Sequence, residues 1–188
     1  MRKLSYLLIA LLSTGIMGCA ATVVGAGAGT AAATGTDTRG FSTVVSDQNL
    51  EHKVNSVLSA QVPNGSFTVA GYSGKILLAG QVPNEDDYDK ADIAVVNTHG
   101  VKKVWNFLTV GKNETVGDIS ADAYITSAAK TRLIGQKGVN TNNIKVVTCA
   151  GVVYLLGQNA GRREQLDAAI SGIRQISGVK NVVNLIRS

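Results

Sequence analysis

The sequence predicts an α+β protein in which one α-β-β-α-β unit occurs twice in tandem. The main observation is an internal repeat, because residues 74–81 (GKILLAGQ) return as residues 151–158 (GVVYLLGQ). A second match follows in step, with residues 100–104 (GVKKV) returning as residues 178–182 (GVKNV). In each copy, apolar residues at helical spacing lie before the first of these two repeated segments and again between the first and the second. Each copy therefore contains helices as well as strands.

Ahead of the repeat, residues 1–18 have the pattern of a lipoprotein signal peptide. Two cations precede an apolar run that ends at Leu12, and Ile16-Met17-Gly18 leads directly to Cys19. This ending resembles the bacterial lipobox, which implies cleavage before Cys19, an S-diacylglycerol group on its sulfur and an N-acyl chain on its amino group. The alternative is a transmembrane anchor, but the apolar run is shorter than the about 20 residues that a spanning helix needs.

Residues 19–46 are expected to form a lipidated, flexible linker. They are rich in Gly, Ala, Ser and Thr, and Asp37 and Arg39 are their charged residues. Such a composition buries too little apolar surface to order itself. The alternative is that the Gly-Ala alternation packs closely against a partner. The two repeat units are expected to follow as residues 47–112 and 113–188.

In the first unit, helical spacing of Leu50, Val54, Val57 and Leu58 predicts a helix. Strands are expected over residues 67–70 and 75–79, with Gly74 in the hairpin turn and Gly80 closing the second strand. After Pro83, Asn84 suits the N-cap of a second helix, and the carboxylates that follow suit the positive end of its dipole. A last strand is expected over residues 101–110.

The second unit repeats this order. Its first helix carries Ile125, Ala129 and Leu133 on its buried side, and strands are expected over residues 144–148 and 152–156. Gly151 and Gly157 take the places of the two structural glycines. The second helix buries Leu166, Ala169, Ile173 and Ile176, and the last strand is expected over residues 179–186.

With the α-β-β-α-β order, the glycines around the middle strand and the Gly-Val-x-x-Val entry to the last strand, each unit resembles the BON domain. Two such units behind a lipobox are similar to the dual BON-domain outer-membrane lipoproteins of Gram-negative bacteria, the DolP type. The resemblance implies two helices packed on a small mixed three-stranded sheet in each domain, no catalysis, and a role in envelope integrity. It also implies a periplasm-facing outer-membrane anchor, which Ala20 after Cys19 favours, and anionic phospholipid as the ligand of the second domain.

Composition excludes several classes of function. Removal of residues 1–18 takes the formal charge from +5 to +3, which is too weakly basic for a nucleic-acid-binding protein. His52 and His99 have no neighbouring ligands at metal spacing, and no nucleophile motif occurs, so we expect no catalytic residue, no metal, no small-molecule substrate and no cofactor beyond the lipid on Cys19. Cys149 has no intrachain partner once Cys19 is lipidated, and we expect a semi-exposed thiol without a role or one that forms an intermolecular disulfide.

A comparison of the two units indicates a lipid-binding face. Residues 47–112 carry six cations and seven anions, whereas residues 113–188 carry nine and five. On a helical wheel, Tyr124 and Ile134 lie opposite the buried stripe, where the first unit has polar Asn49 and Ser59. The predicted phospholipid-binding residues of this helix, with Ile125 and Leu133 as supports, are Tyr124, Ile125, Ala128, Lys130, Arg132, Leu133 and Ile134.

Three alternatives stay open for this face. Tyr124 and Ile134 could pack against the first unit or the linker, or the face could dock a protein. The resemblance implies proximity to the outer-membrane β-barrel assembly machinery, so the docked protein would be one of its components or another envelope protein. A cell-wall hydrolase is the third alternative, and the missing catalytic constellation argues against it.

Overall fold

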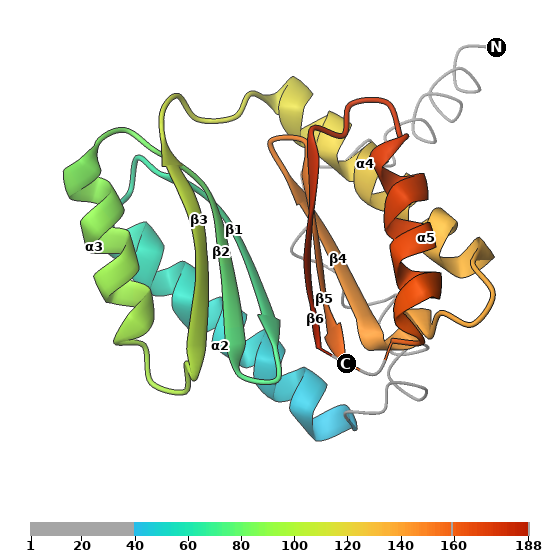
Figure 1. The fold of residues 1–188 in the computed structure, drawn as a ribbon. Coiled ribbons are helices and arrows are strands. Elements are labelled where there is room, and N and C mark those ends of the chain that lie inside the picture. The colour runs from blue at the N-terminus through green and yellow to red at the C-terminus, as the bar shows by residue number, and fades with distance from the viewer. Residues whose placement is uncertain (1–39, 159, 188) are drawn as a thin grey trace, which may run out of the picture. The chain divides into compact units, whose positions relative to one another are not determined.

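The structure is a computed structural model that describes residues 40–158 and 160–187, and these residues contain the α-β-β-α-β order twice (Figure 1). The signal peptide, Cys19 and residues 19–39 of the expected linker lie outside the described residues. The first copy comprises α2 (Phe41–Gln61), β1 (Ser66–Tyr72), β2 (Lys75–Val82), α3 (Glu85–Val96) and β3 (Lys103–Val110). The second comprises α4 (Val116–Gly135), the short η2 (Thr141–Asn143), β4 (Ile144–Cys149), β5 (Val152–Gln158), α5 (Arg163–Arg174) and β6 (Asn181–Arg187).

Each copy has a mixed three-stranded sheet, in agreement with the predicted α+β fold. In the first, β2 lies between β1, which is antiparallel to it, and β3, which is parallel. The second sheet has the same arrangement with β5 in the centre. A tight turn can join antiparallel strands, but parallel neighbours need a longer crossover. Helices α3 and α5 are these crossovers.

The central strand of each sheet is buried on both faces, which explains its continuous apolar sequence. Ile76 and Leu78 of β2 pack in a core with Val54 of α2 and Val95 of α3. Leu77, between them, points to the opposite face and belongs to a different cluster. Because side chains alternate along a strand, Ile76 and Leu78 face the helices of the first copy, whereas Leu77 faces the opposite side of the sheet.

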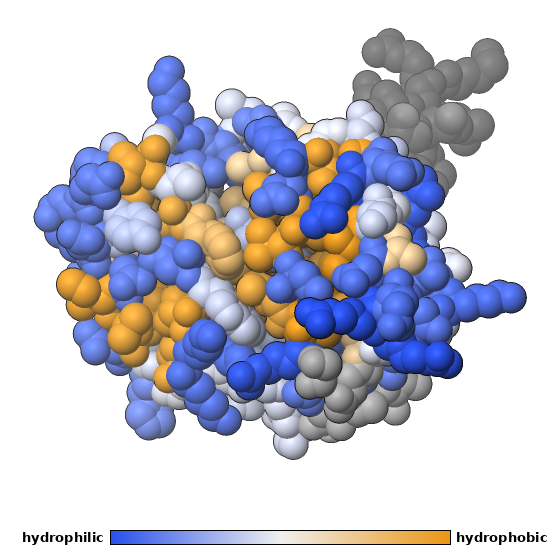
Figure 2. Space-filling model, viewed as in Figure 1, coloured by the Kyte–Doolittle hydropathy of each residue, from blue (hydrophilic) through white to orange (hydrophobic). Residues whose placement is uncertain are grey.

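That other face packs against the second copy. One cluster of buried residues, called here the interlayer cluster, combines side chains from both sheets: Ala70, Tyr72, Leu77, Ala79, Cys149, Tyr154 and Leu156. The rings of Phe107 and Tyr154 lie 5.1 Å apart in it. Figure 2 shows apolar side chains between the two sheets, with hydrophilic ones around them. The two copies therefore share an apolar core.

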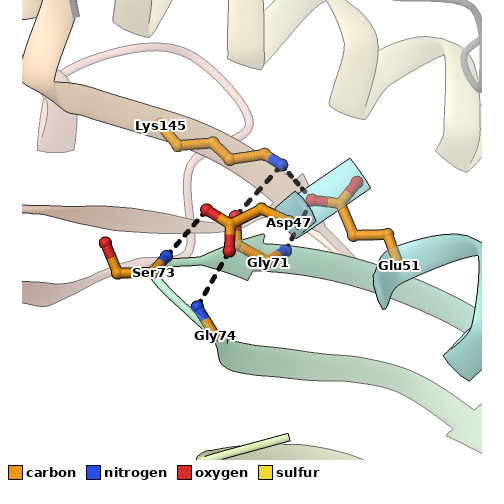
Figure 3. Close-up of polar contacts among 6 residues, drawn as sticks. All are labelled: Asp47, Glu51, Gly71, Ser73, Gly74 and Lys145. Atoms are coloured by element: carbon orange, nitrogen blue, oxygen red, sulfur yellow. Dashed lines mark hydrogen bonds and ion pairs between the residues drawn. The ribbon is translucent and has the colours of Figure 1, made fainter. Parts of the chain in front are cut away.

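Polar contacts at one end of the interlayer cluster also join the copies. The hydroxyl of Tyr72 donates to the carbonyl oxygen of Asn143 at 2.9 Å. The ammonium of Lys145 in β4 pairs with the carboxylate of Glu51 in α2, and Glu51 also accepts from the amide of Gly71 at 2.6 Å (Figure 3).

Two helices begin earlier than the sequence predicted. Helix α2 begins at Phe41, so residues 41–46, which were expected in the linker, are helical. The missed signal is the spacing of Phe41, Val44 and Val45, which suits one face of a helix. Helix α4 begins at Val116, well before the segment from Tyr124 to Ile134 that was placed on the helical wheel.

A buried carboxylate of the first helix in each copy holds the hairpin turn. Ser73 and Gly74 have φ values of 53° and 77°, as the two central residues of a type I′ turn require. Asp47 accepts hydrogen bonds from both of their amides, at 2.7 and 2.8 Å (Figure 3). In the second copy Asp122 accepts from Gly151 at 2.9 Å through one oxygen, and its other oxygen has no hydrogen-bond partner among the described residues.

This difference predicts unequal responses to the same substitution. We expect Asp47→Asn to lower the free energy of unfolding by about 1–3 kcal/mol, because an amide –NH₂ would face a backbone N–H. Asp122→Asn can keep its one hydrogen bond, so we expect a much smaller change. Urea unfolding of both variants measures the difference, and equal losses would contradict the role given to the two oxygens of Asp47.

Candidate membrane-binding face of helix α4

Helix α4 is a 20-residue helix whose start is fixed by a capping box. The Thr115 hydroxyl accepts from the amide of Asp118 at 3.3 Å, and the Asp118 carboxylate accepts from the amide of Thr115 at 2.8 Å. Hydrogen bonds from the hydroxyl and then the amide of Thr115 lower the pKa of Asp118. The motif Thr-x-x-Asp at residues 115–118 is the sequence signal that would have located this helix start.

One side of α4 lies in the core of the second copy. Ile125, Ala129 and Leu133 pack there with residues of β5 and α5. Ile125 and Leu133, which the sequence placed in the lipid-binding set as supports, are thus buried and offer no surface. Ala128, another member of the predicted set, is half-buried.

The opposite side is exposed. Tyr124 and Ile134 are 65% and 73% exposed, and Lys130 and Arg132 are exposed as well. Tyr124 and Ile134 therefore do not pack against the first copy within the described residues. Four of the residues in the predicted set, Tyr124, Lys130, Arg132 and Ile134, are available at the surface.

Two exposed apolar residues were missed. Val116 is 81% exposed and Ile119 is 44% exposed, both in the first turn and a half of α4. At about 100° per residue, Val116 has the same angular position as Ile134, and Ile119 and Tyr124 lie within an arc of about 140° with them. The rise per residue places Val116 about 27 Å from Ile134 along the helix axis. The apolar positions therefore extend along the whole helix.

The twin helix shows that the fold does not need this surface. At the positions of Tyr124, Ser127, Thr131 and Ile134, helix α2 carries Asn49, His52, Ser56 and Ser59, all exposed. Both helices bury the same stripe against the same kind of sheet. Tyr124 and Ile134 are therefore not needed for folding, as expected of residues that contact something else, whereas Val116 and Ile119 correspond to the apolar residues Phe41 and Val44 of α2.

Of the four predicted structural glycines, Gly74 and Gly151 lie in the hairpin turns, whereas Gly80 and Gly157 do not close the central strands but lie inside them, because β2 continues to Val82 and β5 to Gln158. Gly74 and Gly151 occupy the second position of the hairpin turns, with φ near 78° in each case. A Cβ atom on Gly80 would lie 2.0 Å from the carbonyl oxygen of Ser66, and one on Gly157 would lie 2.6 Å from that of Asn143. Gly80 thus faces the backbone of the paired strand β1, and Gly157 faces the backbone of η2 just before β4.

Cys149 differs from its predicted semi-exposed state. It ends β4 and is 3% exposed, because its side chain points into the interlayer cluster. Its Sγ lies 3.4 Å from Oε1 of Glu114. Burial, with the nearby Glu114 carboxylate, raises the pKa of Cys149 to about 12.

His52 and His99 lie at the surface of the first copy. Both line an open groove of about 950 Å³ between α2 and α3. No group of metal-ligating side chains occurs within the described residues. In the same part of the chain, no helix has the length and apolarity to cross a membrane.

The described residues thus form two tandem α+β units that share a core. The second unit also presents the exposed face of α4. The family model of the BON domain matches residues 46–112 and 121–188, and the chain belongs to the BON-domain family. This match indicates no catalytic family.

Over its whole length the chain is similar to the outer membrane lipoprotein DolP of Haemophilus influenzae, with 35% identity covering 100% of the chain and 96% of that protein. It is also 35% identical to the 21 kDa hemolysin of Actinobacillus pleuropneumoniae, covering 80% of the chain and 78% of the hemolysin. The C-terminal domain of CdsD, a structural protein of the Type III secretion system of Chlamydia trachomatis, matches with a TM-score of 0.33 and 16% identity over 74% of the chain and 96% of that domain. The chain is thus a DolP-like outer membrane lipoprotein with two BON domains.

Proposed function

We propose that this lipoprotein helps to maintain the cell envelope by binding anionic phospholipid, of the phosphatidylglycerol type, through helix α4. Cys19 carries the lipid anchor, and the folded residues face the periplasm. Residues 47–112 and 113–188 are the two domains. The observation that carries the proposal is the exposed pair Tyr124 and Ile134 on α4, whose counterparts on α2 are the polar residues Asn49 and Ser59.

The composition of this face suits the boundary between lipid and water. Of the seven large hydrophobic side chains that are exposed in the described residues, four lie on α4: Val116, Ile119, Tyr124 and Ile134. An amphipathic helix that lies in the plane of a bilayer buries such a face at the level of the headgroups. The phenol of Tyr124 can keep its hydroxyl in water while the ring lies in the interface.

Positive charge supports the same ligand. Lys130, Arg132 and Lys137 are exposed in and just after the C-terminal half of α4. Each cation close to an anionic bilayer contributes about 1 kcal/mol. We therefore assign lipid contact to Tyr124, Lys130, Arg132 and Ile134, extend it to Val116 and Ile119, and leave Ile125 and Leu133 as the supports that hold the helix on its sheet.

Vesicle flotation tests this assignment, with residues 20–188 used so that the lipid anchor does not contribute. We expect binding to phosphatidylglycerol vesicles and little binding to phosphatidylcholine vesicles. The double variant Tyr124→Ala, Ile134→Ser is expected to bind about tenfold more weakly because it loses partly buried apolar area. High salt is expected to weaken binding of the wild type, since it screens the cations.

The matched control is Asn49→Ala, Ser59→Ala, which changes the equivalent positions of α2 and is expected to float like the wild type. Binding that ignores vesicle charge and survives the Tyr124, Ile134 double substitution would reject the proposal. It would favour the alternative in which the same face docks a component of the β-barrel assembly machinery or another envelope protein.

A further inference from the structure

Two lysines lie beside Trp105 at one end of the first sheet. Lys75 begins β2 and Lys103 begins β3, and the parallel register places these two residues directly opposite each other. Like charges in directly opposed positions destabilise a sheet. Trp105 lies two residues further along β3, and the Nζ atoms of both lysines lie 5.7 Å from the centre of its indole ring.

Two further cations strengthen the positive field. Burial lowers the pKa of Lys75, and the charges of Arg187, Lys103 and Lys102 lower it further. Figure 1 shows why Arg187 takes part, because the starts of β2 and β3 and the end of β6 lie at the same end of the two sheets. Within the described residues, none of these four cations forms an ion pair with a carboxylate.

The second copy shows that folding does not require this arrangement. In the same register, Val152 of β5 lies opposite Asn181 of β6, and Val183 takes the place of Trp105. The backbone contact before the last strand is the same in both copies, since Lys102 and Lys180 each donate to the carbonyl oxygen of the turn glycine at 2.8 Å. The opposed lysines and the tryptophan are thus an addition of the first copy.

We propose that Lys75 and Lys103 beside Trp105, with Lys102 and Arg187 near Lys75, together called the Trp105 cluster, form a binding site for a phosphate group. A phosphate between the two opposed ammonium groups would replace their repulsion with two charge-assisted hydrogen bonds, which are the stronger kind. Trp105 supports the site because its ring attracts both ammonium groups and holds each of them 5.7 Å from its centre. The phosphate can belong to a membrane phospholipid or to a soluble phosphorylated molecule.

This site is independent of the phospholipid-binding role proposed for α4, since its residues lie on β2, on β3 and the loop before it, and on β6. It also predicts a conflict between stability and binding, which is common where a functional site is strained. Substitution of the twin residues, Lys75→Val and Lys103→Asn, removes the repulsion and the phosphate contacts together. The substituted protein should therefore fold more stably and bind phosphate less well.

The sequence offers a direct probe, because Trp105 is its single tryptophan. The full-length lipidated protein in uncharged detergent micelles is titrated with sodium pyrophosphate at constant ionic strength while tryptophan emission is recorded. We expect a saturable change in emission with pyrophosphate and none with sodium chloride. Lys103→Asn is expected to weaken pyrophosphate binding about tenfold, the loss of one charge-assisted contact. Lys53→Asn removes the same charge from α2 and is expected to bind as the wild type does.

Thermal melting supplies the second measurement. Without phosphate, the Lys75→Val, Lys103→Asn double variant is expected to melt about 2–4 °C above the wild type, as about 1 kcal/mol of relieved repulsion predicts. Pyrophosphate should raise the melting temperature of the wild type and leave that of the variant unchanged. A wild type without a saturable response, or a double variant that binds pyrophosphate equally well, would overturn the site.

The source of the phosphate is decided in a Tyr124→Ala background, in which binding through α4 is weakened. A change in Trp105 emission with phosphatidylglycerol vesicles that Lys103→Asn removes identifies a lipid headgroup. A response to pyrophosphate but not to vesicles identifies a soluble phosphorylated molecule. Loss of vesicle flotation with an intact pyrophosphate response would separate the role of α4 from that of the Trp105 cluster.

Discussion

Substitution of Gly80 by valine is expected to lower the melting temperature by about 10 °C, the effect of about 3 kcal/mol of lost stability. Gly80 has a φ of 135°, which side-chain-bearing residues rarely adopt. Its Cβ would also lie 2.0 Å from the carbonyl oxygen of Ser66 on the paired strand. Relief requires β1 and β2 to separate, and both contribute to the core under α2. Gly157→Val is expected to be destabilising for the steric reason alone.

Thermal melting followed by circular dichroism measures both effects, and Gly111→Val is the matched control. Gly111 follows the last strand of the first copy, and nothing lies within 4 Å of the position of its Cβ. We expect this variant to melt within about 2 °C of the wild type, since surface substitutions usually change stability little. A Gly80→Val protein that melts with the control would show that β1 can move away at little cost.

Periodicity within each copy was enough to predict most of the local structure, but α5 ends at Arg174, and Ile176, which was expected in its buried stripe, is half-buried beyond the helix. Of the residues chosen for the buried stripes of the first helices, Val57 is half-buried, and the others, such as Val54, Leu58, Ala129 and Leu133, are buried. The internal repeat gave each assignment an independent check, because the same spacing occurs twice. Helix starts were less accurate, since the composition of the expected linker continues to Gly40 and hid the helical spacing that begins at Phe41.

Features that depend on contacts between distant segments could not be predicted in this way. Cys149 was expected near the surface because its turn is exposed in most hairpins, but the face it occupies is covered by the other sheet. The opposition of Lys75 and Lys103 depends on the register of two strands that a helix separates. Neither the partner sheet nor the register is visible in the spacing of residues along the chain.

The interlayer cluster is expected to lose stability at alkaline pH. Burial is the main cause that raises the pKa of Cys149 from 9.0 to about 12 and that of Tyr154 from 10.0 to about 12. Each group is neutral when protonated, so the folded protein holds its proton more tightly than the unfolded chain does. The stabilising contribution is complete below about pH 9, where both states are protonated, and is lost as the pH rises toward 12.

We expect the free energy of unfolding to fall by about 2–4 kcal/mol between pH 8 and pH 11. Three pKa units at Cys149 correspond to a ceiling of about 4 kcal/mol. Tyr154 adds less than its own shift suggests, because the charge on either group opposes ionisation of the other and the two titrate as a pair. Urea unfolding of residues 20–188 at a series of pH values measures the fall.

Cys149→Ala separates the titration of the thiol from its packing. The substitution leaves a small cavity and lowers stability at every pH, but we expect the slope between pH 9 and pH 11 to become shallower than that of the wild type. A thiol reagent gives the parallel test, because reagents attack the thiolate. At pH 8 Cys149 should react slowly in the folded protein and rapidly in urea. Equal slopes in both proteins, or fast labelling without urea, would mean that water and base reach Cys149 between the two sheets.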